Sequence, residues 1–233
     1  MNQVATKSSI LVWDLPLRLF HWLLAATFAG AFLTAESESW RDVHVMLGYT
    51  TLALVAFRVA WGFVGTRHAR FASFAYGPSR VVSYLRSLPT RAPHHYTGHN
   101  PAGSWAIYAL LAGVFAAGAT GLAVYNDLGG RWLEHLHEFV ANALLAVVAV
   151  HVMGVIAGSL LHRENLVGSM VTGYKTGHAK DGIGTPRRVV AALLLTLVVG
   201  LWTGVIPTPG LTTAMTSVKA GVGSSAYTAK RYH

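Results

Sequence analysis

Five long apolar segments are the feature that most restricts the fold of this chain. Each is close to the ~20 residues that a helix needs to cross the hydrocarbon core of a membrane. The composition agrees, because 53% of the residues are hydrophobic and only 12% are charged, whereas soluble domains are about one quarter charged. The segments cover approximately residues 17–35, 44–64, 104–125, 135–161 and 189–206. We therefore expect an all-α membrane protein, with a four-helix transmembrane bundle and a fifth transmembrane helix appended to it.

The charges between the segments predict how the chain crosses the membrane. The second and fourth connections are strongly basic, whereas the first and third carry more acidic than basic residues. By the positive-inside rule, the N-terminus and both basic connections face the cytoplasm, and the C-terminal tail faces the periplasm. The basic residues are Arg67, Arg70, Arg80, Arg86 and Arg91 in the second connection and Arg163, Lys175, Lys180, Arg187 and Arg188 in the fourth. We expect a multi-pass protein of the bacterial cytoplasmic (inner) membrane.

The overall charge and the missing cysteines exclude several classes of function. The net charge is +9, but the basic residues flank the apolar segments, which favours contact with membrane lipid over nucleic-acid binding. The chain has no cysteine, which excludes disulfides, iron–sulfur clusters and covalently attached c-type haem. We find no phosphate-binding glycine loop and no Ser-His-Asp set in a plausible fold context, so a soluble enzyme has no support.

Four histidines lie within the apolar segments, where polar side chains are costly and usually functional. His137 and His151 are fourteen residues apart in one segment, which places them ~21 Å apart along a helix and within ~40° of the same face. His21 and His44 lie in the first and second segments. With the N-terminus inside, His21 matches the depth of His151, and His44 matches that of His137. The four residues can therefore hold two metal centres, one above the other.

Each histidine pair can supply two axial imidazoles to one haem. A haem with two histidine ligands has no open coordination position, so it transfers electrons and does not readily bind dioxygen. The alternative is a set of packed core histidines bonded to backbone or serine, but four histidines at matched depths favour ligands. His135 is a rival of His137, yet only His137 shares the helix face of His151.

Two arginines lie close to the predicted inner centre. Arg58 is near the inner end of the second segment, and Arg18 is one turn before His21. Each can bind a haem propionate or a quinone, or it can extend its charge to the membrane surface; we favour the first interpretation. Small residues near the sites either allow close helix packing or leave room for a flat macrocycle, and both interpretations stay open. These glycines are Gly30, Gly48, Gly113, Gly118, Gly121, Gly154 and Gly158.

Seven short stretches occur in order along the chain. They are W-D-L-P-L-R-L-F-H-W (13–22), H-V-M-L-G (44–48), R-V-A-W-G-F-V-G (58–65), G-H-N-P-A-G (98–103), H-E-F (137–139), H-V-M-G-V (151–155) and M-V-T-G (170–173). Together they resemble the bacterial cytochrome b-561 family, which includes the cytochrome b subunits of nickel–iron hydrogenases. The resemblance implies a four-helix core with two b-type haems, whose ligands are His21, His44, His137 and His151. It also implies electron exchange with membrane quinone and a redox partner.

The resemblance and the pattern of segments divide the chain into two parts. Residues 1–175 form the di-haem cytochrome b core, and residues 176–233 form a linker, the fifth transmembrane helix and a periplasmic tail. A homo-oligomer is compatible with this arrangement. Polar groups near the two membrane faces are weak candidates for quinone binding. They are Arg18, Arg58 and Trp61 on the inner side and Asn126, Asp127 and Glu138 on the outer side.

Three hypotheses for the function follow. The first is transmembrane electron transfer between quinone and a periplasmic cytochrome or other redox protein, and it leaves open whether the chain is itself a quinol-linked oxidoreductase. The second is a haem-bearing membrane anchor for a hydrogenase-like oxidoreductase. The third is a haem-free membrane transporter, in which the histidines bind or relay an ion. The third is the weakest, because Glu138 is the only carboxylate within the apolar segments.

Overall fold

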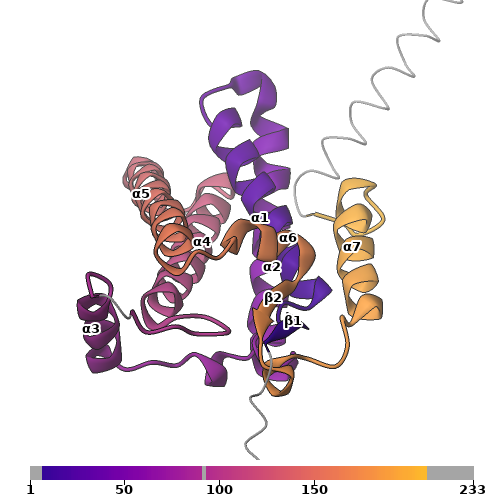
Figure 1. The fold of residues 1–233 in the computed structure, drawn as a ribbon. Helices are drawn as coiled ribbons and strands as arrows, with labels where there is room; N and C mark the ends of the chain where they lie inside the picture. The colour runs from indigo at the N-terminus through magenta and orange to yellow at the C-terminus, as the bar shows by residue number, and fades with distance from the viewer. Residues whose placement is uncertain (1–6, 91–92, 209–233) are drawn as a thin grey trace, which may run out of the picture.

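The computed structural model describes residues 7–90 and 93–208. Within this part the chain forms seven α-helices, three short 3₁₀ helices and one two-stranded sheet (Figure 1). Residues 209–233, which make up most of the expected periplasmic tail, lie outside the described residues, and so does Arg91 of the second connection.

Four helices are long and apolar enough to cross a membrane. They are α1 (Leu15–Thr34), α2 (Arg41–Val64), α4 (Pro101–Tyr125) and α5 (Arg131–His162). They coincide with the first four predicted segments, apart from a few residues at each end. The prediction of an all-α membrane protein with a core of four long helices is therefore confirmed.

Side chains in the loops define where two of these helices begin. Asp14 precedes α1, and its carboxylate accepts a hydrogen bond from the backbone N–H of Leu17 at 2.8 Å. Asn100 precedes α4 in the same way and accepts from the N–H of Gly103 at 2.7 Å. Such capping residues satisfy N–H groups that have no partner in the first turn of a helix. Each of the two helices also has a proline in its first turn, where the missing N–H costs nothing.

The four long helices are arranged as two pairs. α1 packs along α2, and α4 packs along α5, while α2 also contacts α4 and so joins the pairs (Figure 1). The shorter elements are β1 (Ser8–Leu11), η1 (Glu38–Trp40), η2 (Phe71–Ser73), α3 (Pro78–Ser87), α6 (Leu166–Thr172), β2 (Tyr174–Gly177), η3 (Ala179–Asp181) and α7 (Arg188–Trp202). Of these, only η1 belongs to the connection between α1 and α2.

The small sheet identifies one end of the bundle. β1 and β2 pair antiparallel, with Ser8 opposite Gly177 and Leu11 opposite Tyr174. The sheet adjoins the start of α1, since the backbone N–H of Val12 donates to the carbonyl of Gly173 at 2.8 Å. We call this the sheet end; α1 and α4 begin there, and α2 and α5 end there. The opposite end is called the far end.

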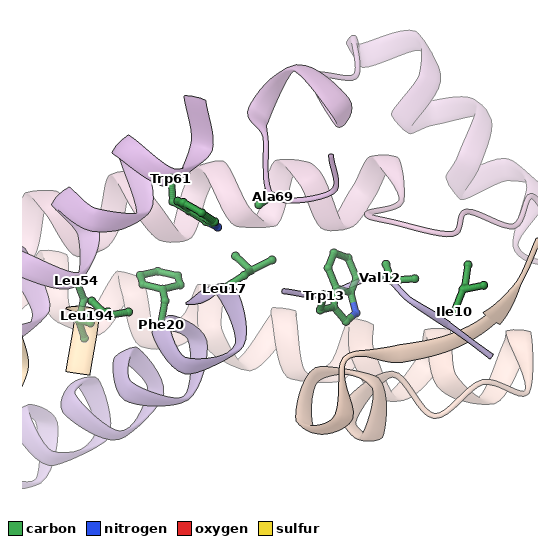
Figure 2. Close-up of a cluster of buried hydrophobic side chains, with 9 residues drawn as sticks. All are labelled: Ile10, Val12, Trp13, Leu17, Phe20, Leu54, Trp61, Ala69 and Leu194. Carbon is green, nitrogen blue, oxygen red and sulfur yellow. The ribbon is translucent and has the colours of Figure 1, made fainter. Parts of the chain in front are cut away.

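A continuous apolar core runs into the sheet end. Figure 2 shows its buried side chains extending from Leu54 and Leu194 at one end of the cluster to Ile10 at the other. Trp13 and Val12 lie between β1 and the helices, and both are almost fully buried. Packing thereby fixes β1 and the start of α1 relative to α2, and with them the first part of the helix that carries His21.

The fifth predicted transmembrane segment forms the appended helix α7, which is shorter than expected. α7 has 15 residues, about 22 Å of helix, against a hydrocarbon core of about 30 Å. It ends where Gly204 takes a left-handed backbone conformation, with φ +74°, a common helix stop. The indole N–H of Trp202 donates to the hydroxyl of Thr50 on α2 at 3.1 Å. α7 packs against α1 and α2, away from α4 and α5 (Figure 1).

Candidate functional site

The far end brings His44 of α2 and His137 of α5 face to face. Their ring centres are 6.3 Å apart, and the ring planes are perpendicular, at 89°. A metal ion bound between two imidazole nitrogens, with bonds of about 2.0 Å, separates the ring centres by about 6 Å. The spacing therefore fits two axial ligands of one iron.

Hydrogen bonds on the other side of each ring fix its protonation. Nδ1 of His44 lies 2.8 Å from the carbonyl oxygen of Ala31 on α1. Nδ1 of His137 lies 3.0 Å from the carbonyl of Ala117 on α4 and 3.1 Å from the hydroxyl of Thr120. A carbonyl oxygen only accepts, so each Nδ1 carries the proton and each Nε2 keeps its lone pair. Both imidazoles are thus prepared to bind a metal through Nε2.

Neighbouring glycines make room for this arrangement. Gly121 of α4 lies against the His137 ring, where an added methyl group would come within 2.9 Å of Cε1. Gly48, one turn after His44, faces open space instead, with nothing within 4 Å of the position of a Cβ atom. Gly113 and Gly118 pack against leucines of neighbouring helices. Close helix packing therefore applies to Gly113 and Gly118, and the space beside Gly48 is compatible with a flat macrocycle. His135 is exposed.

The sheet-end pair is arranged differently. His21 of α1 and His151 of α5 are electrostatic neighbours, and the ring of His21 packs edge-on against Trp22 at 5.0 Å. Nδ1 of His21 is buried with no hydrogen-bond partner in the described chain. The ring nitrogens of His151 likewise have no partner among the described residues. A polar atom left in this state indicates a binding partner from outside the chain.

The two arginines of the sequence analysis both lie at the sheet end. Arg58 is only 2% exposed, and its guanidinium stacks over the ring of Phe71 at 4.7 Å. Its charge therefore does not reach the membrane surface, and its Nη1 has no partner within the described residues. Arg18 donates from Nη2 to the carbonyl of Val171, while its Nε is also buried and unpaired in the described chain.

His99 is a residue of this region that the sequence analysis did not single out. Its ring lies 4.6 Å from Trp13 and 4.5 Å from Phe74, and its Nδ1 is buried and unpaired within the described residues. Burial and, to a lesser extent, the charge of Arg58 lower the pKa of His99 to about 3. The G-H-N-P-A-G stretch contains this histidine, but it precedes α4 in a connection, so a search within apolar segments passes over it.

The weaker candidates for quinone binding have other contacts. The indole N–H of Trp61 donates to both carboxylate oxygens of Asp14, at 3.2 and 3.1 Å. Asn126, at the far end, donates to the carbonyl of Leu122 at 2.7 Å. Asp127 and Glu138 are exposed.

Helices of membrane-spanning length with facing imidazoles between them are the features of a membrane cytochrome of the b type. The comparison of sequences is more specific: the chain belongs to the prokaryotic cytochrome b561 family, which matches residues 12–173. It is therefore a multi-pass membrane protein of the cytochrome b class, which binds haem b and transfers electrons.

Several curated relatives have similar sequences and the same name, probable Ni/Fe-hydrogenase B-type cytochrome subunit. The relative from Azotobacter vinelandii is 26% identical over 221 residues, which cover 75% of this chain and 91% of the relative. The relative from Rhodobacter capsulatus is 25% identical, and the matched region covers 76% of this chain and 85% of the relative. The relative from Cupriavidus necator is 26% identical, and the matched region covers 71% of this chain and 86% of the relative. No solved structure matches the chain significantly.

Proposed function

We propose that this protein transfers electrons across the bacterial cytoplasmic membrane through two b-type haems, each held by two histidines. His44 and His137 hold one haem at the far end, and His21 and His151 hold the other at the sheet end. The observation that carries the proposal is the far-end pair, with a ring separation of 6.3 Å and both Nδ1 atoms bonded to helix backbone. When bound, the haem iron supplies a site that gains and loses one electron.

The protein residues contribute orientation and electrostatics. The carbonyls of Ala31 and Ala117 hold the far-end imidazoles in the tautomer that presents Nε2, and such a bond also makes the imidazole a stronger ligand. At the sheet end, Arg58 and Arg18 are placed to bind the carboxylates of a haem, because each has one buried nitrogen, Nη1 of Arg58 and Nε of Arg18, that is unpaired in the described chain. Charge-assisted hydrogen bonds of this kind are the strong ones.

The orientation follows from the basic connections. The sheet end carries the arginines and lysines of both, so we place it at the cytoplasm and the far end at the periplasm. The core of residues 1–175 then holds both haems, and residues 176–233 add the linker, α7 and the tail. The two haem sites lie ~21 Å apart along α5, so each serves one face of the membrane.

Quinone and a periplasmic redox protein are the proposed reaction partners. The names of the relatives favour a hydrogenase-like oxidoreductase subunit as that partner, with this chain as its membrane anchor. A partner that copurifies at a fixed ratio supports the anchor. A preparation without such a partner that oxidises quinol with a soluble cytochrome as acceptor supports the free-standing carrier.

The test is a haem count by pyridine haemochrome and a reduced-minus-oxidised spectrum of the purified protein. We expect two low-spin b haems per chain. Substituting alanine for either member of one pair should remove one haem and leave most of the other. His135→Ala is the matched control and should keep both haems. Loss of both haems from one single substitution contradicts the pairing, and absence of haem after haem-replete expression favours the haem-free transporter.

A further inference from the structure

A basic cavity lies at the sheet end, between the end of α2 and the start of α7. Its volume is about 490 Å³, and its lining includes Arg67, Arg70, Arg187, Thr66 and Thr185. The cavity is separate from all four candidate haem ligands, so its occupancy can be tested independently of the haems.

The charge of this cavity is only partly compensated. Arg67 forms an ion pair with Asp181 at 3.8 Å and also donates to the carbonyl of Lys180 at 3.2 Å. Arg70 and Arg187 have no acidic partner among the described residues. The cavity therefore holds two uncompensated guanidinium groups, which favour an anionic ligand.

The position of the cavity along the helices fits the headgroup layer of a membrane. The last residues of α2, Phe63 and Val64, expose 71% and 76% of their surface, as expected for side chains that face lipid. Gly65, the next residue, already lines the cavity. At α7, Arg187 lines it and the apolar Val189, two residues further, is 74% exposed. The cavity thus lies where lipid-facing apolar surface gives way to arginine on two neighbouring helices.

The backbone of Arg187 is strained, which needs a reason. Its φ is +56° and its ψ is 47°, in the left-handed region, which is unfavourable for a residue with a side chain. Arg163 has a similar φ of +50°, but it follows the end of α5, where this conformation is a common helix stop. A residue before a helix is normally extended. Such strain is concentrated at ligand-binding positions.

We propose that this cavity binds the phosphate of an anionic phospholipid headgroup from the leaflet on the sheet-end side. One guanidinium group can donate two parallel hydrogen bonds to the oxygens of a phosphate. Basic pockets between transmembrane helices recognise anionic headgroups. A lipid is the occupant rather than soluble phosphate, because the cavity adjoins the lipid-facing ends of α2 and α7. Thr66, which lines the cavity, also donates from its hydroxyl to Asp14 at 2.5 Å and so links the cavity to the residue that precedes α1.

The experiment measures lipid binding to the full-length protein in detergent by native mass spectrometry and thermal unfolding. The probes are phosphatidylglycerol, phosphatidylcholine and inorganic phosphate. The variant Arg70→Gln with Arg187→Gln removes the two unpaired charges. At ~1 kcal/mol for each arginine, it should weaken phosphatidylglycerol binding about thirty-fold. The matched control is Arg86→Gln with Arg163→Gln, which removes two arginines from the same end of the bundle but outside the cavity.

Support requires that the wild type and the control retain phosphatidylglycerol, and gain thermal stability from it, while the cavity variant does neither. Equal weakening in the control means that the attraction belongs to the whole basic surface, and it overturns the proposal. Equal binding of phosphatidylcholine, or displacement of the lipid by millimolar inorganic phosphate, also overturns it. Haem content is recorded for each variant, so that a collapsed fold is not mistaken for loss of the lipid.

Discussion

The far-end and sheet-end histidine pairs differ in what holds the imidazoles. At the far end, His44 and His137 each donate to a helix carbonyl, and the hydroxyl of Thr120 also lies beside Nδ1 of His137. At the sheet end, His21 has no such bond in the described chain, and buried charged or polar groups such as Arg58 and Asp14 lie around the start of α1. The far end therefore orients its imidazoles with hydrogen bonds to the helix backbone, whereas packing alone orients the ring of His21 in the described chain.

This difference has an electrostatic consequence. Buried positive charge stabilises a reduced iron relative to an oxidised one, since reduction adds an electron. The buried Arg58 and the partly buried Arg18 lie at the sheet end, and the buried basic residues of the described chain include none on the far-end part of α2 or α5. We therefore expect the sheet-end haem to be reduced at the higher potential.

The substitution with the largest expected effect, Asp14→Ala, destabilises the sheet end alone. Asp14 is completely buried and accepts hydrogen bonds from the backbone of Leu17, the indole of Trp61 and the hydroxyl of Thr66. Asp14→Ala leaves these donors unsatisfied and should lower the free energy of unfolding by about 3–5 kcal/mol. Thermal unfolding followed at the haem absorbance should show the sheet-end signal lost first.

The control for this substitution is Asp42→Ala, an exposed carboxylate at the far end, which should change the unfolding temperature little. Simultaneous loss of both haem signals in Asp14→Ala would contradict the independence of the two ends.

The next effect disturbs the far end alone. In Gly121→Ala the new methyl group lies within 2.9 Å of Cε1 of His137, and that ring is fixed by its bonds to Ala117 and Thr120. Overpacking of this kind costs about 1–3 kcal/mol. We expect a broadened or partly lost far-end haem band and an unchanged sheet-end band. Gly154→Ala, where a methyl group meets nothing within 4 Å, should leave the far-end band intact.

A third prediction concerns how the stability of the protein changes at low pH. The lowered pKa of His99, about 3, means that the unfolded chain takes up a proton below pH ~6.5 while the folded chain does not. Stability should therefore fall as the pH drops from 6.5 towards 3, by about 1 kcal/mol at pH 5.5. Denaturation at a series of pH values should show a flatter dependence in His99→Leu than in the wild type.

Burial also lowers the pKa of His68, so His99→Leu should keep part of the acid sensitivity. His94→Leu changes an exposed histidine of the same connection and should follow the wild-type profile. A profile for His99→Leu identical to the wild type would show that His99 is not the group responsible.

The smallest effect tests the hydroxyl beside His137. Thr120→Val keeps the shape of the side chain and the bond from Nδ1 to Ala117, but it removes the contact at 3.1 Å. We expect a loss of about 0.5–1 kcal/mol and a slight shift of the far-end reduction potential, measured by redox titration. Thr196→Val on α7, whose hydroxyl donates to the carbonyl of Ala192, should shift neither potential.

The sequence predicts the parts of this structure that follow from local periodicity. Segment length and hydropathy locate the four long helices, and the fourteen-residue spacing places His137 and His151 on one face of α5. The pairing of His44 with His137 follows from matching depths in the membrane. The structure brings these two rings together at the expected end of the bundle.

Features that depend on contacts distant in sequence were missed. β1 pairs with β2 across more than 160 residues, and neither strand has a pattern long enough to predict it. Nδ1 of His99 is buried where Trp13 and Phe74, both distant in sequence, pack against its ring. The end of α7 depends on the left-handed conformation of Gly204, whereas hydropathy alone continues to residue 206.

The carbonyls of Ala31 and Ala117 have a consequence for how this site tolerates change. Every amino acid has a main-chain carbonyl, so the groups that align the far-end imidazoles do not depend on which side chain occupies either position. Ala31 is also in the last turn of α1, where helix carbonyls lack backbone partners, and its carbonyl accepts from both His44 and the hydroxyl of Thr34. Relatives can thus diverge at both positions, and mutational scans can find them silent, although both carbonyl oxygens set the orientation of an imidazole.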